Sequence, residues 1–177
     1  MNRTIARIAA AAALALGSLS PAAAQLAEGT KAPAFTTQAA LAGKEFGFSL
    51  SAALAKGPVV LYFYPKAFTQ GCTLEANAFA EAMPQFKALG ASVIGMSNDD
   101  IETLKRFSRE ECRDAFPVGV ASPQLITAYD VAMGQSGLAS RTSYVIGRDG
   151  KVVTVYSSGD YRGHVTKTLE AVRKLAR

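Results

Sequence analysis

Cys72 is the residue whose position in the sequence most directly suggests chemistry. It follows the apolar run of residues 59–64, where a strand would give way to a helix. A helix N-terminus presents unpaired backbone N–H groups and the positive end of the helix dipole, which favour a thiolate, the nucleophilic form of cysteine. Thr69 can direct a hydroxyl into the same space, and a distant arginine could complete an electropositive pocket. A buried, inert cysteine is the alternative interpretation.

The chain has one other cysteine, Cys112, and the compartment decides what the pair could do. Residues 1–24 are typical of a secretory signal peptide, with two arginines, an apolar stretch too short for a comfortable membrane span, and three alanines ending at Ala24. We expect a soluble mature chain of residues 25–177, periplasmic or secreted. Disulfides persist in such compartments, so a plain structural disulfide is one interpretation. A redox role is the other, because a domain of this size buries an adequate core without a covalent staple.

The hydrophobic pattern predicts the elements that must position Cys72. Residues 59–64 form a continuous apolar run, which suits a strand buried on both faces. Residues 73–89 carry apolar side chains at helical spacing, with Pro84 expected to kink or restart the helix and Gly90 to end it. A second short strand is expected at residues 91–96. Before the first strand we expect a loop containing Pro33 and a turn at Gly57-Pro58.

The second half of the chain also carries patterns typical of helices and strands. A helix begins near Asp100 with capping side chains in residues 97–99, a hairpin joins residues 143–146 to residues 152–156 through Asp149-Gly150, and a final amphipathic helix covers residues 165–175. This order predicts one α/β domain with a central mixed β-sheet flanked by helices. A thioredoxin-like architecture fits it.

Composition and missing motifs exclude several function classes. The chain is 49% hydrophobic and 19% charged, as expected for one globular domain. Its formal charge is +5, but basic and acidic residues alternate along the chain, which argues against nucleic-acid binding. The sequence contains no phosphate-cradling glycine loop, nucleophilic serine elbow or metal-ligand cluster. We therefore expect no bound cofactor, no metal and no membrane or nucleic-acid partner.

The residues around Cys72 resemble a known active site. Pro65-x-x-x-Thr69-x-x-Cys72 matches the active-site motif of the peroxiredoxins. Residues 62–66 and 71–76 are most similar to the bacterioferritin-comigratory, or Q-type, branch of that family. The likeness extends over most of the mature chain and implies a thioredoxin-like fold.

The resemblance also implies an activity, the thiol-dependent reduction of hydrogen peroxide and organic hydroperoxides. Cys72 would attack the O–O bond and become a sulfenic acid. Thr69 would hydrogen-bond the thiolate and the peroxide, and Pro65 would shield the sulfur from water. Arg141, just before the predicted hairpin, matches the family's catalytic arginine and would stabilise the thiolate and the breaking bond.

Several positions depart from the pattern of the Q-type branch: Asn77, and also Ala67, Phe68 and Gln70, where that branch commonly has an acidic pair and a proline. Its resolving cysteine often lies five residues after the peroxidatic one, where this chain has Asn77. Cys112 is the remaining candidate resolver, because some family members have a resolving cysteine in that later helix; a one-cysteine mechanism and a structural role stay open. Phe68 could make the mouth of the site apolar and favour organic hydroperoxides, or it could pack against the sheet.

Partners and one alternative function complete the expectations. The electrons would come from a thioredoxin-like protein or a small thiol, and the resembled branch is largely monomeric. The alternative is a periplasmic copper carrier on a similar fold, with soft ligands drawn from Cys72, Met83, Met96, Met133 and His164. We expect His164 to be a surface or capping residue rather than a catalytic base.

Overall fold

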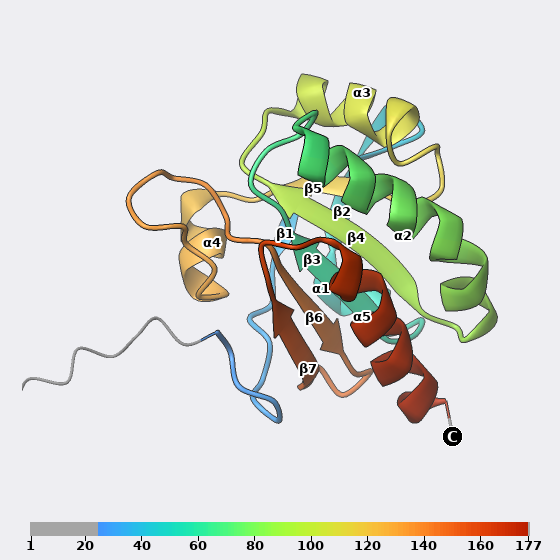
Figure 1. The fold of residues 1–177 in the computed structure, drawn as a ribbon. Coiled ribbons are helices and arrows are strands. Elements are labelled where there is room, and N and C mark those ends of the chain that lie inside the picture. The colour runs from blue at the N-terminus through green and yellow to red at the C-terminus, as the bar shows by residue number, and fades with distance from the viewer. Residues whose placement is uncertain (1–24, 177) are drawn as a thin grey trace, which may run out of the picture.

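A seven-stranded mixed sheet lies between two layers of helices in the computed structural model, which describes residues 25–176 (Figure 1). The predicted signal segment lies outside these residues. The elements in chain order are β1 (Thr36–Leu41), β2 (Lys44–Ser49), α1 (Leu50–Leu54), β3 (Val59–Phe63), α2 (Gln70–Ala88), β4 (Ser92–Ser97), α3 (Ile101–Glu110), β5 (Val118–Val120), α4 (Pro123–Ala128), β6 (Thr142–Ile146), β7 (Val152–Ser157) and α5 (Arg162–Leu175). The strand order is β2-β1-β5-β4-β3-β6-β7. The predicted fold class is confirmed.

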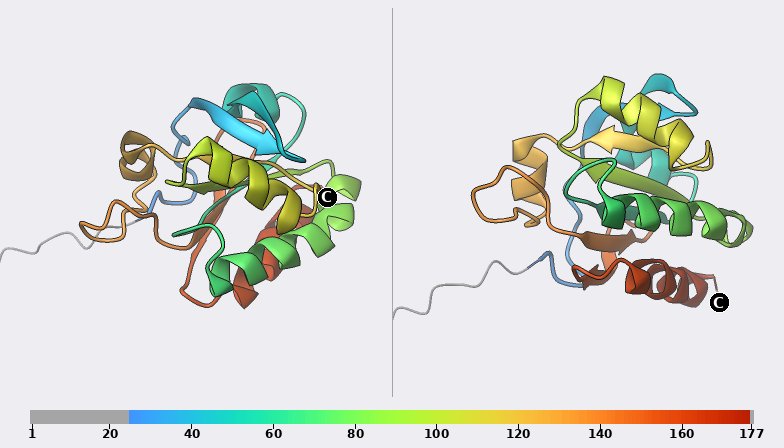
Figure 2. Two further views of the ribbon diagram at one scale, coloured as in Figure 1. Left: turned by 90° about the horizontal axis from the view of Figure 1, so that it is seen from above. Right: turned by 45° about the horizontal axis from the view of Figure 1, so that its top comes forward.

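The central strand β3 explains why the apolar run has no polar alternation. Val60 and Tyr62 belong to a core cluster built with α2, α3 and α5, whereas Leu61 and Phe63 belong to a second cluster with α1 and α4. Helices therefore cover both faces of the strand, as the views of Figure 2 show. β3 pairs in parallel with β4 and antiparallel with β6.

Helix α2 begins earlier than predicted and is not interrupted. It starts at Gln70, so Cys72 lies inside its first turn. It continues through Pro84, so the predicted restart is wrong. Pro84 is exposed, and a proline on the outer face leaves the packed side of the helix intact. Gly90 follows the helix with φ of 70°, a left-handed conformation that glycine adopts at little cost.

The N-terminus of α3 also differs from the prediction. Asp100 is the N-cap, and its side chain accepts the Thr103 N–H at 2.9 Å. Asp99, predicted to be among the capping residues, bonds elsewhere. The predicted hairpin is present as β6 and β7, and the final helix is present as α5.

Five further elements occupy stretches with no predicted structure or a predicted loop: strands β1 and β2, which form a hairpin, helix α1, strand β5 and helix α4. They are short, and β1 has little alternation of large apolar side chains. β5 has three residues and forms because β1 and β4 pair with it on either side. Within residues 25–176, no helix is long and apolar enough to cross a membrane.

Candidate active site

Cys72 lies in the first turn of α2, after the loop that follows β3. Thr69 is the helix N-cap, and its carbonyl accepts the Thr73 N–H at 2.9 Å. The N–H groups of a first helical turn have no partner within the helix, and they stabilise negative charge nearby. Cys72 is only 2% exposed. The predicted placement of this thiol at a helix N-terminus is confirmed.

Arg141 reaches Cys72 because of the pairing between β6 and β3. Thr142 is opposite Phe63 in this antiparallel register, so the residue preceding β6 lies where β3 gives way to the active-site loop. The Arg141 Nη2 donates to Cys72 Sγ at 3.4 Å. A Cβ at Gly71 would lie 3.1 Å from Nη2, so the missing side chain leaves room for the guanidinium. The structure thus brings together two predicted site residues that are 69 positions apart.

Glu75 joins Cys72 and Arg141 in the site, although the sequence predicted no role for it. It lies three residues after Cys72, is fully buried, and accepts a hydrogen bond from Arg141 Nη1 through Oε2. Burial raises the pKa of Glu75 to about 8, although the charge of Arg141 acts in the opposite direction. The i, i+3 spacing from Cys72, which places both side chains on one helix face, is the sequence signal that would have identified it.

His164 is fully buried, so the prediction of a surface or capping residue is wrong. Its Nδ1 lies 2.8 Å from Ser143 Oγ and 3.7 Å from Glu75 Oε1, and its Nε2 lies 3.1 Å from the Ser158 carbonyl. The ring of Tyr156 packs edge-on against the imidazole. Burial lowers the pKa of His164 to about 4. Helix α5 turns this residue toward β6 rather than toward solvent.

The loop before Cys72 is anchored by Asp99. Its carboxylate accepts the Ala67 N–H at 2.8 Å and the Ser97 hydroxyl at 2.9 Å, and it pairs with Lys66 Nζ at 3.3 Å. The carboxylate is almost completely buried, whereas the lysine is mostly exposed. Asp99 therefore fixes the loop to the end of β4 instead of capping α3.

The remaining predicted residues of the loop have distinct environments. Thr69 is exposed, and its hydroxyl donates to the Lys66 carbonyl at 2.9 Å. Pro65 is half-buried beyond the end of β3. Phe68 has φ of 62°, an unusual conformation for a bulky residue. Its ring is edge-on to Phe107 with centroids 5.2 Å apart, so it packs against α3 rather than the sheet and stays 37% exposed.

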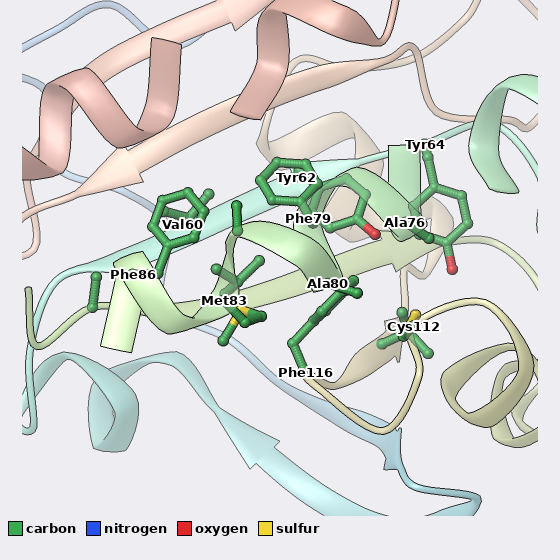
Figure 3. Close-up of a cluster of buried hydrophobic side chains, with 14 of the residues drawn as sticks. Val60, Tyr62, Tyr64, Ala76, Phe79, Ala80, Met83, Phe86, Cys112 and Phe116 are labelled. Carbon is green, nitrogen blue, oxygen red and sulfur yellow. The ribbon is translucent and has the colours of Figure 1, made fainter. Parts of the chain in front are cut away.

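Cys112 follows α3 and is completely buried. Figure 3 shows it in the same core cluster as Tyr62, Tyr64, Ala76 and Phe116. The cluster also contains Cys72, and both cysteines are free thiols. Burial raises the pKa of Cys112 well above its ordinary value, and nearby acidic groups add to this effect.

Asn77, at the position where the Q-type branch often has its resolving cysteine, connects the two cysteine-bearing segments. Its Nδ2 donates to the Thr73 carbonyl at 2.8 Å and to Glu111 Oε2 at 3.0 Å. Glu111 immediately precedes Cys112. The amide therefore ties the first turns of α2 to the segment that carries the second thiol.

The soft ligands of the copper-carrier alternative do not converge. Met83 and Met96 belong to core clusters on opposite faces of the sheet, and Met133 is largely exposed. His164 is occupied by its serine partners. Among the residues that the structure describes, no group of three or more histidine, cysteine, aspartate or glutamate side chains could hold a metal ion.

The arrangement around Cys72 supports nucleophilic sulfur chemistry. A thiolate there faces the first-turn N–H groups of α2 and the Arg141 guanidinium, which is itself 9% exposed. The same two sources of positive charge would stabilise negative charge on an oxygen displaced at the sulfur.

Comparison with known proteins identifies relatives of this chain. Residues 29–155 match the model of the AhpC/TSA family. The chloroplastic peroxiredoxin Q of Suaeda salsa is 34% identical over 155 residues, covering 86% of this chain and 70% of its own. A putative peroxiredoxin of Mycobacterium tuberculosis is 35% identical over 130 residues, covering 71% of this chain and 84% of its own.

Two solved structures are similar to this chain in both fold and sequence. Peroxidoxin BcpB from Mycobacterium tuberculosis superposes with a TM-score of 0.75 at 33% identity, covering 84% of this chain and 97% of that one. The bacterioferritin comigratory protein of Xanthomonas campestris, whose structures were described for its alkyl peroxide reduction activity, has a TM-score of 0.69 at 28% identity, covering 79% and 92%.

Proposed function

This chain belongs to the AhpC/TSA family and is a thiol-dependent peroxidase of the peroxiredoxin type, and from that premise we propose that Cys72 is its peroxidatic cysteine. The observation that carries the proposal is the 3.4 Å contact between Cys72 Sγ and Arg141 Nη2 at the N-terminus of α2. No other cysteine among the described residues combines a helix N-terminus with an arginine, since Cys112 lies in the apolar core.

The first step is attack by the Cys72 thiolate on the terminal oxygen of a hydroperoxide. An S–O bond forms, the O–O bond breaks, and the sulfur is oxidised to a sulfenic acid. The displaced oxygen leaves as hydroxide or alkoxide and takes a proton from solvent, giving water or an alcohol. Arg141 is placed to stabilise both the thiolate and the negative charge that develops on the O–O bond.

Thr69 and Pro65 shape the approach to the sulfur in this proposal. The Thr69 hydroxyl is bonded to the Lys66 carbonyl, so it remains free to accept a hydrogen bond from the incoming peroxide. Rotation of the hydroxyl would let it donate to the thiolate instead. Pro65 has no backbone N–H to attract water and partly covers the loop.

Cys112 is the proposed resolving cysteine. Its sulfur would attack the Cys72 sulfenic acid, forming the S–S bond and releasing hydroxide, which takes up the thiol proton to give water. Burial and the raised pKa of Cys112 hold it as a thiol until the segment rearranges. Loosening of the first turn of α2, which Asn77 ties to Glu111, would bring the sulfurs together.

We also propose a substrate class, a reductant, an oligomeric state and a location for the enzyme. Phe68, a partly exposed ring beside α3, supports the use of organic hydroperoxides as well as hydrogen peroxide. A dithiol reductant of the thioredoxin type, or a small thiol, would reduce the disulfide. We place the enzyme, as a monomer, in the periplasm or outside the cell on the sequence pattern of residues 1–24.

The test is the intact mass of the reduced protein within seconds of adding one equivalent of hydrogen peroxide. The wild type should lose two hydrogens, Cys112→Ser should gain one oxygen, and Cys72→Ser should not change. Oxygen gain without disulfide in the wild type would establish a one-cysteine mechanism and refute Cys112 as resolver. An unchanged mass in the wild type would refute Cys72 as the peroxidatic residue.

A further inference from the structure

Two buried ionisable side chains lie next to each other beside Arg141, and one of them, Glu75, is bonded to its guanidinium. Glu75 projects from α2 and His164 from α5, and both are fully buried. Glu75 Oε1 lies 3.7 Å from His164 Nδ1 and has no hydrogen-bond partner. Buried polar atoms are nearly always paired, so an unpartnered carboxylate oxygen beside an imidazole calls for a physical reason.

The hydrogen bonds of His164 fix which of its nitrogens carries hydrogen. Nε2 lies 3.1 Å from the Ser158 carbonyl, which can only accept, so Nε2 carries the hydrogen. Burial lowers the pKa of His164 to about 4, so the ring is neutral and Nδ1 presents a lone pair. That lone pair accepts the Ser143 hydroxyl at 2.8 Å. His164 therefore has no hydrogen to donate to Glu75, and an ionised Oε1 would face a second electron-rich atom.

The charges around Arg141 also disfavour an ionised Glu75. Its guanidinium donates to Glu75 Oε2 through Nη1 and to Cys72 Sγ through Nη2, so one cation serves two potential anions. If both were ionised, a site excluded from water would hold an uncompensated negative charge, which is costly. Burial raises the pKa of Glu75 to about 8, consistent with a carboxyl that retains its proton.

The other groups that face this pair supply no further cation. From β3, the Tyr62 phenol approaches Glu75, and burial keeps it neutral. From β7, Tyr156 packs against the imidazole of His164. Asp160, before α5, is the remaining charged neighbour of His164, and it is exposed to solvent.

We propose that Glu75 is protonated on Oε1 in the reduced enzyme, because His164 has no hydrogen to donate to that oxygen, and that the charge of Arg141 is therefore opposed by the Cys72 thiolate alone. Glu75 and His164 are then positioning residues that act through Arg141. The role rests on the proposed function of Cys72. Loss of this proton would place a second anion on Arg141 and weaken its hold on the thiolate and on the charge of the breaking O–O bond.

Two spectroscopic measurements test where the proton resides. Infrared spectra of the reduced wild type near neutral pH should contain the C=O stretch of a protonated carboxylic acid, which Glu75→Gln removes and Glu81→Gln retains. Glu81 is the matched control, because it is an exposed carboxylate on the same helix. The chain has a single histidine, so its ¹⁵N ring signals are unambiguous and should show a neutral ring with hydrogen on Nε2. A missing band, or an imidazolium at neutral pH, would overturn the proposal.

The pH dependence of the peroxide reaction tests the effect on Cys72. The rate constant for sulfenic acid formation in Glu75→Gln, divided by that of the wild type, should rise about tenfold from about pH 6.5 to about pH 9.5, because only the wild type loses the Glu75 proton. A constant ratio would refute the coupling. Sulfenic acid formation without the infrared band would refute this inference alone, whereas a band without any peroxide reaction would refute the role of Cys72.

Discussion

Replacing Asp99 with alanine should destabilise the protein and displace the loop that leads to Cys72. The substitution leaves the buried Ala67 N–H without a partner and removes the acceptor of the Ser97 hydroxyl. An unsatisfied buried donor costs about 1–3 kcal/mol, and hydrogen bonds to a charged group contribute about 1.5–3 kcal/mol, so we expect a loss of about 3 kcal/mol. The ion pair with Lys66 adds little, because that lysine is mostly exposed.

The experiment compares this variant with Asp100→Ala, which removes the same charge one residue later. Asp100 caps α3 at the surface and does not contact the loop. Urea unfolding should show the larger loss of stability for Asp99→Ala, and only that variant should speed hydrogen exchange at the Ala67 amide and slow sulfenic acid formation, by about tenfold or more. Equal stability losses, or an Ala67 amide protected as in the wild type, would show that Asp99 does not anchor the loop.

Substitutions at three further residues test the site. Arg141→Lys should slow sulfenic acid formation about a hundredfold in single-turnover assays, because one ammonium cannot reproduce the fork that contacts Glu75 and Cys72; a loss below threefold would contradict this role. Thr69→Val should slow the same step by at least about tenfold while Thr69→Ser retains the wild-type rate, and equal rates would argue against the hydroxyl. Between about pH 4.5 and about pH 8 the folded state binds the Glu75 proton and the unfolded chain does not, so wild-type stability should fall with rising pH by up to about 1.4 kcal/mol per unit relative to Glu75→Gln. Parallel stability curves from urea titrations would rule this out.

The parts of the fold that the sequence predicted are those whose pattern is local. The apolar run that becomes β3, the helical spacing of α2 and the Asp-Gly turn between β6 and β7 can each be recognised within a short window. β1 and β5 could not be, because their residues become strands only where neighbouring strands pair with them. The helix does not restart at Pro84, because the cost of the proline is offset by packing along the opposite face.

The site residues, like the elements of the fold, were predictable where the signal is local and were missed where it is not. Cys72 and Thr69 were predictable from a turn between two elements, and Arg141 from resemblance to a family. The roles of Glu75 and His164 were missed, because their partners lie on other elements far along the chain and no short motif indicates such long-range contacts. The resemblance identified Arg141, which contacts the Cys72 sulfur, but it assigned no role to Glu75 or His164 beside it.

The register between β6 and β3 makes peroxide reactivity a property of the finished fold. Cys72 receives its guanidinium from a residue 69 positions later, which arrives only when β6 has paired with β3. Such non-local pairing forms late compared with a single helix, so a chain still being synthesised carries at this position an ordinary, slow-reacting thiol. If Cys72 is the peroxidatic residue, we expect it to react with peroxide at the full rate only after β6 has paired with β3.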